Sequence, residues 1–246
     1  DADTIYEEDA LKNLVRNFSD PKVGGVCGKL VLIKEGAASC NEESIYWDYE
    51  NRIKELESSL RTITGINGQA FAIGRELFEE LPRDSITEDQ VLGMRIIERG
   101  YDILFEPKAI CREKAHPLKE EFMRRIRISA GNFQSISFSA KVLDPRTGFA
   151  SFAFWSHKIL RWFAPFFLIA LFISNMYLLD ILFFRFTFFT QVLFYLISFF
   201  HYGLSVIGYD FKILRVIFYF NMMNLAVLIG FFRFITGTQK VTWEKA

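Results

Sequence analysis

The chain has 246 residues, with 29 basic and 29 acidic side chains, so its formal net charge is zero. This balance hides two different halves: residues 1 to about 160 have the mixed composition of a soluble domain, whereas Phe, Leu and Ile dominate from Trp162 onward. Neither half carries the basic stripe that nucleic-acid binding requires, so no nucleic-acid partner is expected. Three cysteines without metal-ligand spacing argue against a zinc site and indicate reduced cytoplasmic thiols.

The first 115 residues alternate between helix-like and strand-like segments. The longest helical pattern, over 41–61, repeats apolar residues every three or four positions from Ile45 to Leu60, which predicts one apolar face. Such alternation favours an α/β sheet covered by helices. The expected elements are a helix over 8–18, a strand over 23–33, the helix over 41–61, a glycine-bearing loop and strand over 65–73, a short helix over 75–81, a helix from Thr87 to Gly100 and a strand over 103–111.

The stretch Thr87-Glu88-Asp89-Gln90 can be a helix start or a pair of carboxylates placed for chemistry. As a helix start, Thr87 and Gln90 have the spacing of a capping box, in which each side chain bonds a backbone N–H of the other end. Gly100 then suits the left-handed position after the last turn. Taken alone, this stretch favours the structural interpretation.

Beyond residue 115 the composition changes twice. Residues 120–138 carry Arg124, Arg125 and Arg127 among apolar residues, the pattern of an amphipathic helix on a membrane surface. Three apolar stretches follow, over 163–184, 187–207 and 213–235, each near the ~20 residues that a membrane-spanning helix needs.

Three crossings have a topological consequence. If residues 1 to about 160 lie in the cytoplasm, three crossings place the loop over 208–212 on the cytoplasmic side of the membrane and the tail after Gly237 on the opposite side. The third stretch contains Asn221, Asn224 and Gly230, so it is the one expected to be re-entrant or interfacial if any of the three fails to cross.

The chain opens on a second acidic pair, Asp1-Ala2-Asp3. Alternate carboxylates at the end of a strand can converge on one hard cation such as Mg²⁺ or Mn²⁺. Alone, this D-x-D pattern is weak, because two aspartates one residue apart are common at loop ends and are usually just solvated.

The order of these features is more informative than any one of them. D-x-D, "TGINGQAFAIGRELF", "TEDQVLGMRIIERGYDILFEP", an arginine-rich helix and then apolar helices form a succession that resembles the membrane-bound family 2 glycosyltransferases, which include cellulose, chitin and hyaluronan synthases. The resemblance covers essentially the whole chain. It implies an α/β fold, the second half of a GT-A nucleotide-diphospho-sugar transferase domain, with an interfacial helix and about three transmembrane helices. The chain is then expected to be a fragment whose nucleotide-binding half precedes Asp1. The expected divisions are 1–118 catalytic, 119–161 interfacial, 162–236 transmembrane and 237–246 tail.

The resemblance also implies roles for individual residues. A positioned carboxylate can take the proton of an acceptor hydroxyl, which is a poor nucleophile at neutral pH. Glycine lets the backbone approach a sugar ring closely, and arginine can hold a phosphate through two parallel hydrogen bonds. The implied assignments are Asp1 and Asp3 for Mg²⁺ or Mn²⁺ and the diphosphate, Asp89 with its neighbour Glu88 for catalysis, Gly65, Gly68 and Gln69 for the acceptor, and Arg124 and Arg127 for substrate phosphate.

One departure from the family bears on processivity. Processive members usually carry Q-x-x-R-W on the interfacial helix, and in that register this chain keeps Arg127 but has Ile128 in place of the tryptophan. The segment Lys158 to Trp162 has a similar shape about thirty residues later, but a tryptophan and an arginine at a helix entry are more simply an interfacial anchor. His116 and His157 are expected to be packing or surface groups.

The sequence thus predicts an inverting glycosyltransferase of surface polysaccharide synthesis, moving a sugar from a nucleotide-sugar donor to a glycan acceptor. Two alternatives stay open: a non-processive enzyme that adds one sugar to a lipid acceptor, and an inactive membrane scaffold of the same fold. All three are integral membrane proteins of a bacterial inner or plasma membrane, in contact with membrane lipids, with the catalytic domain in the cytoplasm.

Overall fold

The computed structural model describes residues 4–33, 41–209 and 211–241. Within this part of the chain, one mixed four-stranded sheet has the order β1-β4-β2-β3. The two long central strands run parallel, and each short edge strand pairs antiparallel with its neighbour. The strands are β1 (Ile5–Tyr6), β2 (Val23–Ile33), β3 (Phe71–Ile73) and β4 (Asp102–Lys114).

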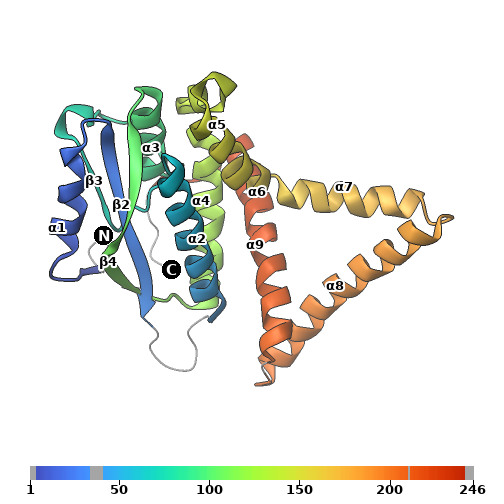
Figure 1. The fold of residues 1–246 in the computed structure, drawn as a ribbon. Coiled ribbons are helices and arrows are strands. Elements are labelled where there is room, and N and C mark those ends of the chain that lie inside the picture. The colour runs from blue at the N-terminus through green and yellow to red at the C-terminus, as the bar shows by residue number, and fades with distance from the viewer. Residues whose placement is uncertain (1–3, 34–40, 210, 242–246) are drawn as a thin grey trace.

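Helices cover both faces of the sheet (Figure 1), as the predicted alternation requires. α1 lies on one face, and α2, α3 and α4 lie on the other. The helices are α1 (Ala10–Val15), α2 (Asn41–Leu60), α3 (Glu88–Glu98), α4 (Leu118–Phe138), α5 (Phe149–Ala153), α6 (Leu160–Trp162), α7 (Ala164–Tyr177), α8 (Leu182–Val206) and α9 (Lys212–Ile235), with a π-helical turn η5 (Phe154–Ile159) between α5 and α6.

β2 has the predicted bounds. Both of its faces are covered and its first six residues are buried, as the continuous apolar run of a central parallel strand requires. The predicted helix over 8–18 is shorter: α1 is followed by a 3₁₀ turn, η1 (Arg16–Ser19). The expected helix over 75–81 is also only a 3₁₀ turn, η2 (Arg75–Leu77).

α2 has the predicted length but buries the opposite face. The apolar residues Ile45, Tyr49 and Leu56 are 50% or more exposed, whereas the charged side chains of Glu50 and Lys54 are buried. The apolar pattern was therefore the wrong guide to the inward face of this helix. The buried charges have partners on distant segments, which the spacing within α2 cannot reveal.

α3 begins at Glu88 with Thr87 as its N-cap, but the expected capping box is absent. The Thr87 hydroxyl makes no capping hydrogen bond, and the Gln90 amide donates instead to the Thr64 carbonyl at 3.2 Å. The other end agrees with prediction: Gly100 has φ +87°, and its N–H and that of Tyr101 bond back to Ile97 and Ile96 as in a Schellman motif.

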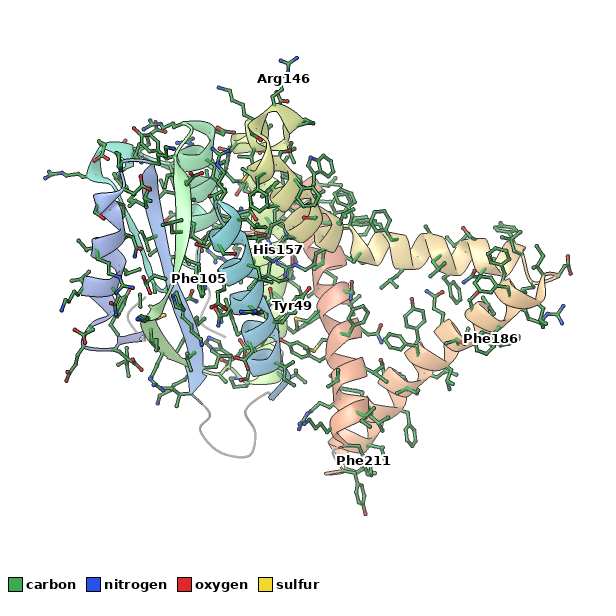
Figure 2. All side chains as sticks on the ribbon, viewed as in Figure 1. Tyr49, Phe105, Arg146, His157, Phe186 and Phe211 are labelled. Atoms are coloured by element: carbon green, nitrogen blue, oxygen red, sulfur yellow. The ribbon has the colours of Figure 1, made fainter. Side chains whose placement is uncertain are left out.

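Among the described residues, the apolar region holds two unbroken candidate spans, and a third only if the bent pair 149–162 and 164–177 is counted as one span. α8 and α9 are long and apolar enough to cross a membrane, whereas α7 has 14 residues and meets the preceding helical segment at a bend of 58°. The first stretch, rather than the third, is therefore the broken one. The three helices form the sides of an open triangle (Figure 1), and Phe186 and Phe211 project outward from it (Figure 2).

α9 is continuous because its polar and small residues have protein partners. The Asn221 amide donates to the Ser198 hydroxyl on α8. At Gly230, a Cβ would lie 2.6 Å from the Ile126 carbonyl oxygen, so the missing side chain lets α9 pack closely on α4. Asn221 therefore has a partner on a neighbouring helix, and Asn224 donates to the Phe220 carbonyl within α9 at 2.9 Å.

Candidate active site

A cavity of about 610 Å³ lies where the loops after α2 and before α3 meet α2, α4 and the η5–α6 segment. The structure brings most of the predicted site residues to this one place. The cavity wall includes Gly68, Gln69, Glu88, Asp89, Arg124 and Arg127. Gly65 is the exception: it lies behind the wall, where a Cβ would meet the Lys158 ammonium group at 2.6 Å.

Asp89 is held in the wall by backbone hydrogen bonds. Its Oδ2 accepts from the Gly68 N–H at 3.0 Å, and its Oδ1 accepts from the Gln90 N–H at 2.8 Å. Burial raises the pKa of Asp89, although these N–H groups and the nearby Lys54 ammonium act in the opposite direction. A helix N-terminus favours the charged form of a carboxyl group, but at Asp89 burial outweighs that effect.

Lys54 is the cation that faces this region from α2. It is 1% exposed, and its ammonium group donates to the Asn67 side-chain oxygen. Asn67 and Gly68 belong to the loop that touches Asp89, so a chain of contacts joins the buried Lys54 of α2 to the candidate base.

Arg127 lies on α4 beside the acidic pair. Burial lowers its pKa, while the charges of Asp89 and Glu88 oppose that shift. Its Nη2 donates to the Val241 carbonyl oxygen at 2.9 Å, and Val241 itself lines the cavity. The segment after α9 therefore returns to the cavity, so it lies on the same side as the α/β domain, contrary to the predicted tail on the far side of the membrane.

Gln69 connects the cavity loop to the sheet. Its backbone oxygen accepts from the Tyr6 hydroxyl at 2.6 Å, and its side-chain amide donates to Glu113 at 3.0 Å. Glu113 lies on β4 and Tyr6 on β1, so two strands fix the position of the loop that presents Gly68.

The arginines of α4 do not face outward. Arg124 and Arg125 have side chains only 12% and 17% exposed, pair with the buried Glu121 and line the cavity. Arg124 and Arg125 therefore face the interior of the protein, and the interfacial role of the helix stays a prediction. Ile128, at the position of the family tryptophan, also lines the cavity, so that position reaches the site without an aromatic ring.

The sequence interpretation missed a second group of charged residues. Glu50 accepts from Lys158 at 2.8 Å, from Arg161 at 2.7 Å and from His157 at 3.1 Å, and His157 also bonds Glu57 at 2.8 Å. Burial alone would raise the pKa of Glu50, but Lys158 and Arg161 hold it well below its usual range. His157 comes from η5 and lies beside α2 (Figure 2).

Lys158, Arg161 and Trp162 all line the cavity, so the segment treated as a membrane anchor belongs to the site. Trp162 is 4% exposed and packs against Phe133 and Phe154. The K-x-x-R-W pattern of residues 158–162 was the sequence signal that could have identified them as part of the cavity wall. The π-helical turn that carries Lys158 is a form often found at functional sites.

The predicted metal ligands Asp1 and Asp3 lie outside the described residues. Within the described ranges, no group of three or more His, Cys, Asp or Glu side chains is arranged to hold a metal ion. The metal assignment therefore stays a prediction.

A family model described as "Glycosyl transferase family group 2" matches residues 1–232. The chain belongs to this family. The match extends from the predicted D-x-D through the residues of the cavity and into α9, so it covers both the α/β domain and the apolar helices.

Curated relatives match about half of the chain. An O-antigen chain rhamnosyltransferase of Salmonella typhimurium is 30% identical over 130 residues, which are 49% of this chain and 41% of the relative. A poly-beta-1,6-N-acetyl-D-glucosamine synthase of Staphylococcus aureus is 29% identical over 116 residues, 45% of this chain and 28% of the relative. The matched part spans less than half the length of either relative.

A solved mannosyltransferase from Pyrobaculum calidifontis, in complex with GDP-Man and Mn²⁺, is similar over 96% of this chain and 60% of its own, with a TM-score of 0.61 and 20% identity. This likeness shows the shared fold and confirms the expected GT-A-like architecture of mixed sheet and helices.

Proposed function

We propose that this protein is an inverting glycosyltransferase that moves a sugar from a nucleotide-sugar donor to a glycan acceptor in surface polysaccharide synthesis. The observation that carries the proposal is the meeting of Asp89 and Arg127 in one cavity, a carboxyl group with a raised pKa beside an arginine. Family membership supports the reaction class, and the two curated relatives support the polysaccharide context.

Asp89 is the proposed general base. An acceptor hydroxyl hydrogen-bonded to its carboxylate passes its proton to Asp89 as the oxygen attacks the anomeric carbon from the face opposite the diphosphate. The Gly68 and Gln90 N–H groups orient the carboxylate, and a base placed in this way typically contributes about 10²–10⁴-fold in rate. Glu88, exposed on the same turn, supplies negative charge that favours the protonated form of Asp89 after transfer.

The phosphate groups of the donor are assigned to Arg127, with Arg124 beside it on α4. A guanidinium can hold phosphate oxygens through two parallel hydrogen bonds. Gly68 and Gln69 are assigned to the acceptor side, and Gly65 supports that loop from behind.

Asp1 and Asp3 are the proposed carboxylate ligands of Mg²⁺ or Mn²⁺. The chemistry that a bound divalent ion supplies is neutralisation of charge on the leaving diphosphate. Support comes from Tyr6, three residues after Asp3, which hydrogen-bonds the cavity loop, and from the Mn²⁺ bound in the similar mannosyltransferase. Replacing Asp3 with Asn should weaken Mn²⁺ binding, measured by the electron paramagnetic resonance signal of free Mn²⁺; an unchanged signal would contradict this assignment.

The alternative of a non-processive enzyme with a lipid acceptor is favoured by one observation, the presence of Ile128 where a stacking tryptophan is usual. An inactive scaffold is the remaining alternative, and it predicts no transfer from any donor. The three are separated by incubating the full-length protein in membranes with a panel of radiolabelled nucleotide sugars. Label in a large product supports the proposal, label in a small lipid product supports the first alternative, and no label supports the second.

The proposed membrane arrangement has two crossings, α8 and α9. An odd number of crossings would separate the tail from the catalytic domain, whereas Arg127 bonds Val241. In cells, single cysteines at Tyr209 and Gln239 in a cysteine-free background should differ: an impermeant thiol reagent should label Tyr209→Cys and leave Gln239→Cys protected. The reverse pattern would contradict two crossings with a cytoplasmic domain.

A further inference from the structure

The wall of the cavity formed by α2, α4 and the η5–α6 segment is rich in cations. Arg124 and Arg125 reach it from α4, and Lys158 and Arg161 reach it from the segment some thirty residues later. Glu50 is the carboxylate that lines the cavity beside them, and it is bonded to both Lys158 and Arg161.

Two of these guanidinium groups share one aromatic ring. The Arg125 guanidinium carbon lies 4.6 Å from the centroid of Tyr46, and that of Arg161 lies 5.7 Å from it. Like charges held this close repel each other, and the carboxylates of Glu121 and Glu50, paired with Arg125 and Arg161, offset that repulsion.

Carboxylates support the cations from behind. Glu121 is fully buried, pairs with Arg125 and lies 3.7 Å from Arg124, and it is not part of the cavity wall. Arg124 Nη1 has no hydrogen-bond partner among the described residues. The acidic groups thus fix the guanidinium groups in place, and Arg124 Nη1 is left as a donor for a ligand.

We infer that this wall is an anion subsite that binds a phosphate group carried by the acceptor, through Arg161, Lys158 and Arg125. The inference rests on the proposed function and assigns the acceptor a chemical class, a phosphate ester or diphosphate ester. It also gives Glu50 a role: a positioning residue that holds Lys158 and Arg161 toward the cavity.

The test uses the full-length protein in nanodiscs and measures binding, so it does not depend on transfer. Farnesyl phosphate is the probe, with farnesol and inorganic phosphate as competitors, and quenching of Trp47 and Trp162 in the cavity wall is the readout. Arg161→Gln should weaken farnesyl phosphate binding by at least tenfold. Arg52→Gln, on the exposed face of α2, should leave it unchanged.

The competitors identify the source of the phosphate. If inorganic phosphate fails to displace farnesyl phosphate, the subsite serves a phosphate on a lipid. If inorganic phosphate binds as tightly as farnesyl phosphate does, the subsite serves a soluble phosphate ester. Equal binding of farnesol, or unchanged binding in Arg161→Gln, would overturn the inference. So would an equal loss of nucleoside diphosphate binding in that variant, because the wall would then belong to the donor.

Removing Arg161 alone leaves Glu50 with one cation fewer, which could prevent folding. The double variant Glu50→Gln/Arg161→Gln removes one charge of each sign and gives the same prediction for binding. A cooperative melting curve shows that either variant is folded. Asp89→Asn should bind farnesyl phosphate normally, so loss of transfer in that variant tests the proposed function and leaves this inference untouched.

Discussion

Asp89 and Glu50 line the same cavity, yet their carboxyl groups are held in opposite ways. Burial raises the pKa of Asp89, whose closest partners are the backbone N–H groups of Gly68 and Gln90. Burial would also raise the pKa of Glu50, but Lys158 and Arg161 hold it well below its usual range. Two carboxyl groups whose environments separate their pKa values have separate roles: Asp89 can take a proton, and Glu50 stays an anion that orders cations.

The largest stability effect should come from removing Glu50. Glu50→Ala leaves Lys158, Arg161 and His157 without their shared carboxylate, and breaking a buried ion pair from one side typically costs about 3–5 kcal/mol. Glu55→Ala is a matched control in the same helix, since its exposed pair with Arg52 is worth about 0–1 kcal/mol. Denaturant unfolding measures both. Equal costs would mean that the cationic wall does not depend on Glu50.

The position of Asp89 at the start of α3 depends on close packing at Gly131. A Cβ at this position would lie 2.6 Å from the Thr87 methyl group, two residues before Asp89. Gly131→Ala should therefore displace the start of α3, costing about 1–3 kcal/mol and reducing transfer. Gly203→Ala, in an open part of α8, is the control and should cost no stability and leave transfer unchanged. Normal transfer by Gly131→Ala would show that the position of Asp89 tolerates movement.

The two carboxyl groups should give stability opposite dependences on pH. The pKa of Asp89 is higher in the folded protein than in the unfolded chain, where it is about 3.9. The stability that Asp89 contributes is therefore fully present below the unfolded pKa and is lost as pH rises through the folded pKa. Asp89→Asn should therefore be more stable than the wild type at pH 7, with a difference that shrinks on acidification.

Glu50 gives the matched contrast. Its folded pKa is lowered, so its contribution is present above the unfolded value of about 4.3 and is lost as pH falls through the folded value. Glu50→Gln should therefore be less stable than the wild type at pH 7 and approach it in acid. Melting temperatures between pH 3 and pH 8 measure both variants. Parallel curves for the two would contradict the assignment of opposite environments.

The smallest effect concerns the start of α3. The Thr87 hydroxyl is buried and has no hydrogen-bond partner among the described residues, so Thr87→Val removes an unsatisfied group and keeps the side-chain shape. This substitution should be neutral or slightly stabilising in thermal unfolding. A loss of about 1 kcal/mol would instead show that Thr87 caps the helix after all.

Sequence reasoning located one wall of the cavity and missed the other. Asp89, Gly68 and Arg127 belong to segments whose order along the chain resembles the family, and the structure brings them together. Glu50 and Lys158 are 108 residues apart, and neither shows locally that the other is its partner.

α2 explains why the second wall was missed. An apolar stripe predicts the buried face of a helix only when apolar side chains fill the space it faces. Here that space holds His157, Lys158 and Arg161, so Glu50 and Lys54 turn inward and Tyr49 turns outward. The positions of β2, α2, α3 and β4 were predictable because local pattern and turn residues determine them. The orientation of α2 was not, because it depends on charges contributed from elsewhere.

The role of Asp89 as the base can be tested through the dependence of the transfer rate on pH. Full-length wild type and Asp89→Asn are compared in vesicles at saturating donor between pH 4 and pH 8. The wild-type rate should fall in acid with a midpoint above the ordinary aspartate pKa of about 3.9. Asp89→Asn should be slower by about 10²–10⁴-fold and lack that acid limb. An Asp89→Asn protein that kept most of the rate, or the same acid limb, would contradict the claim.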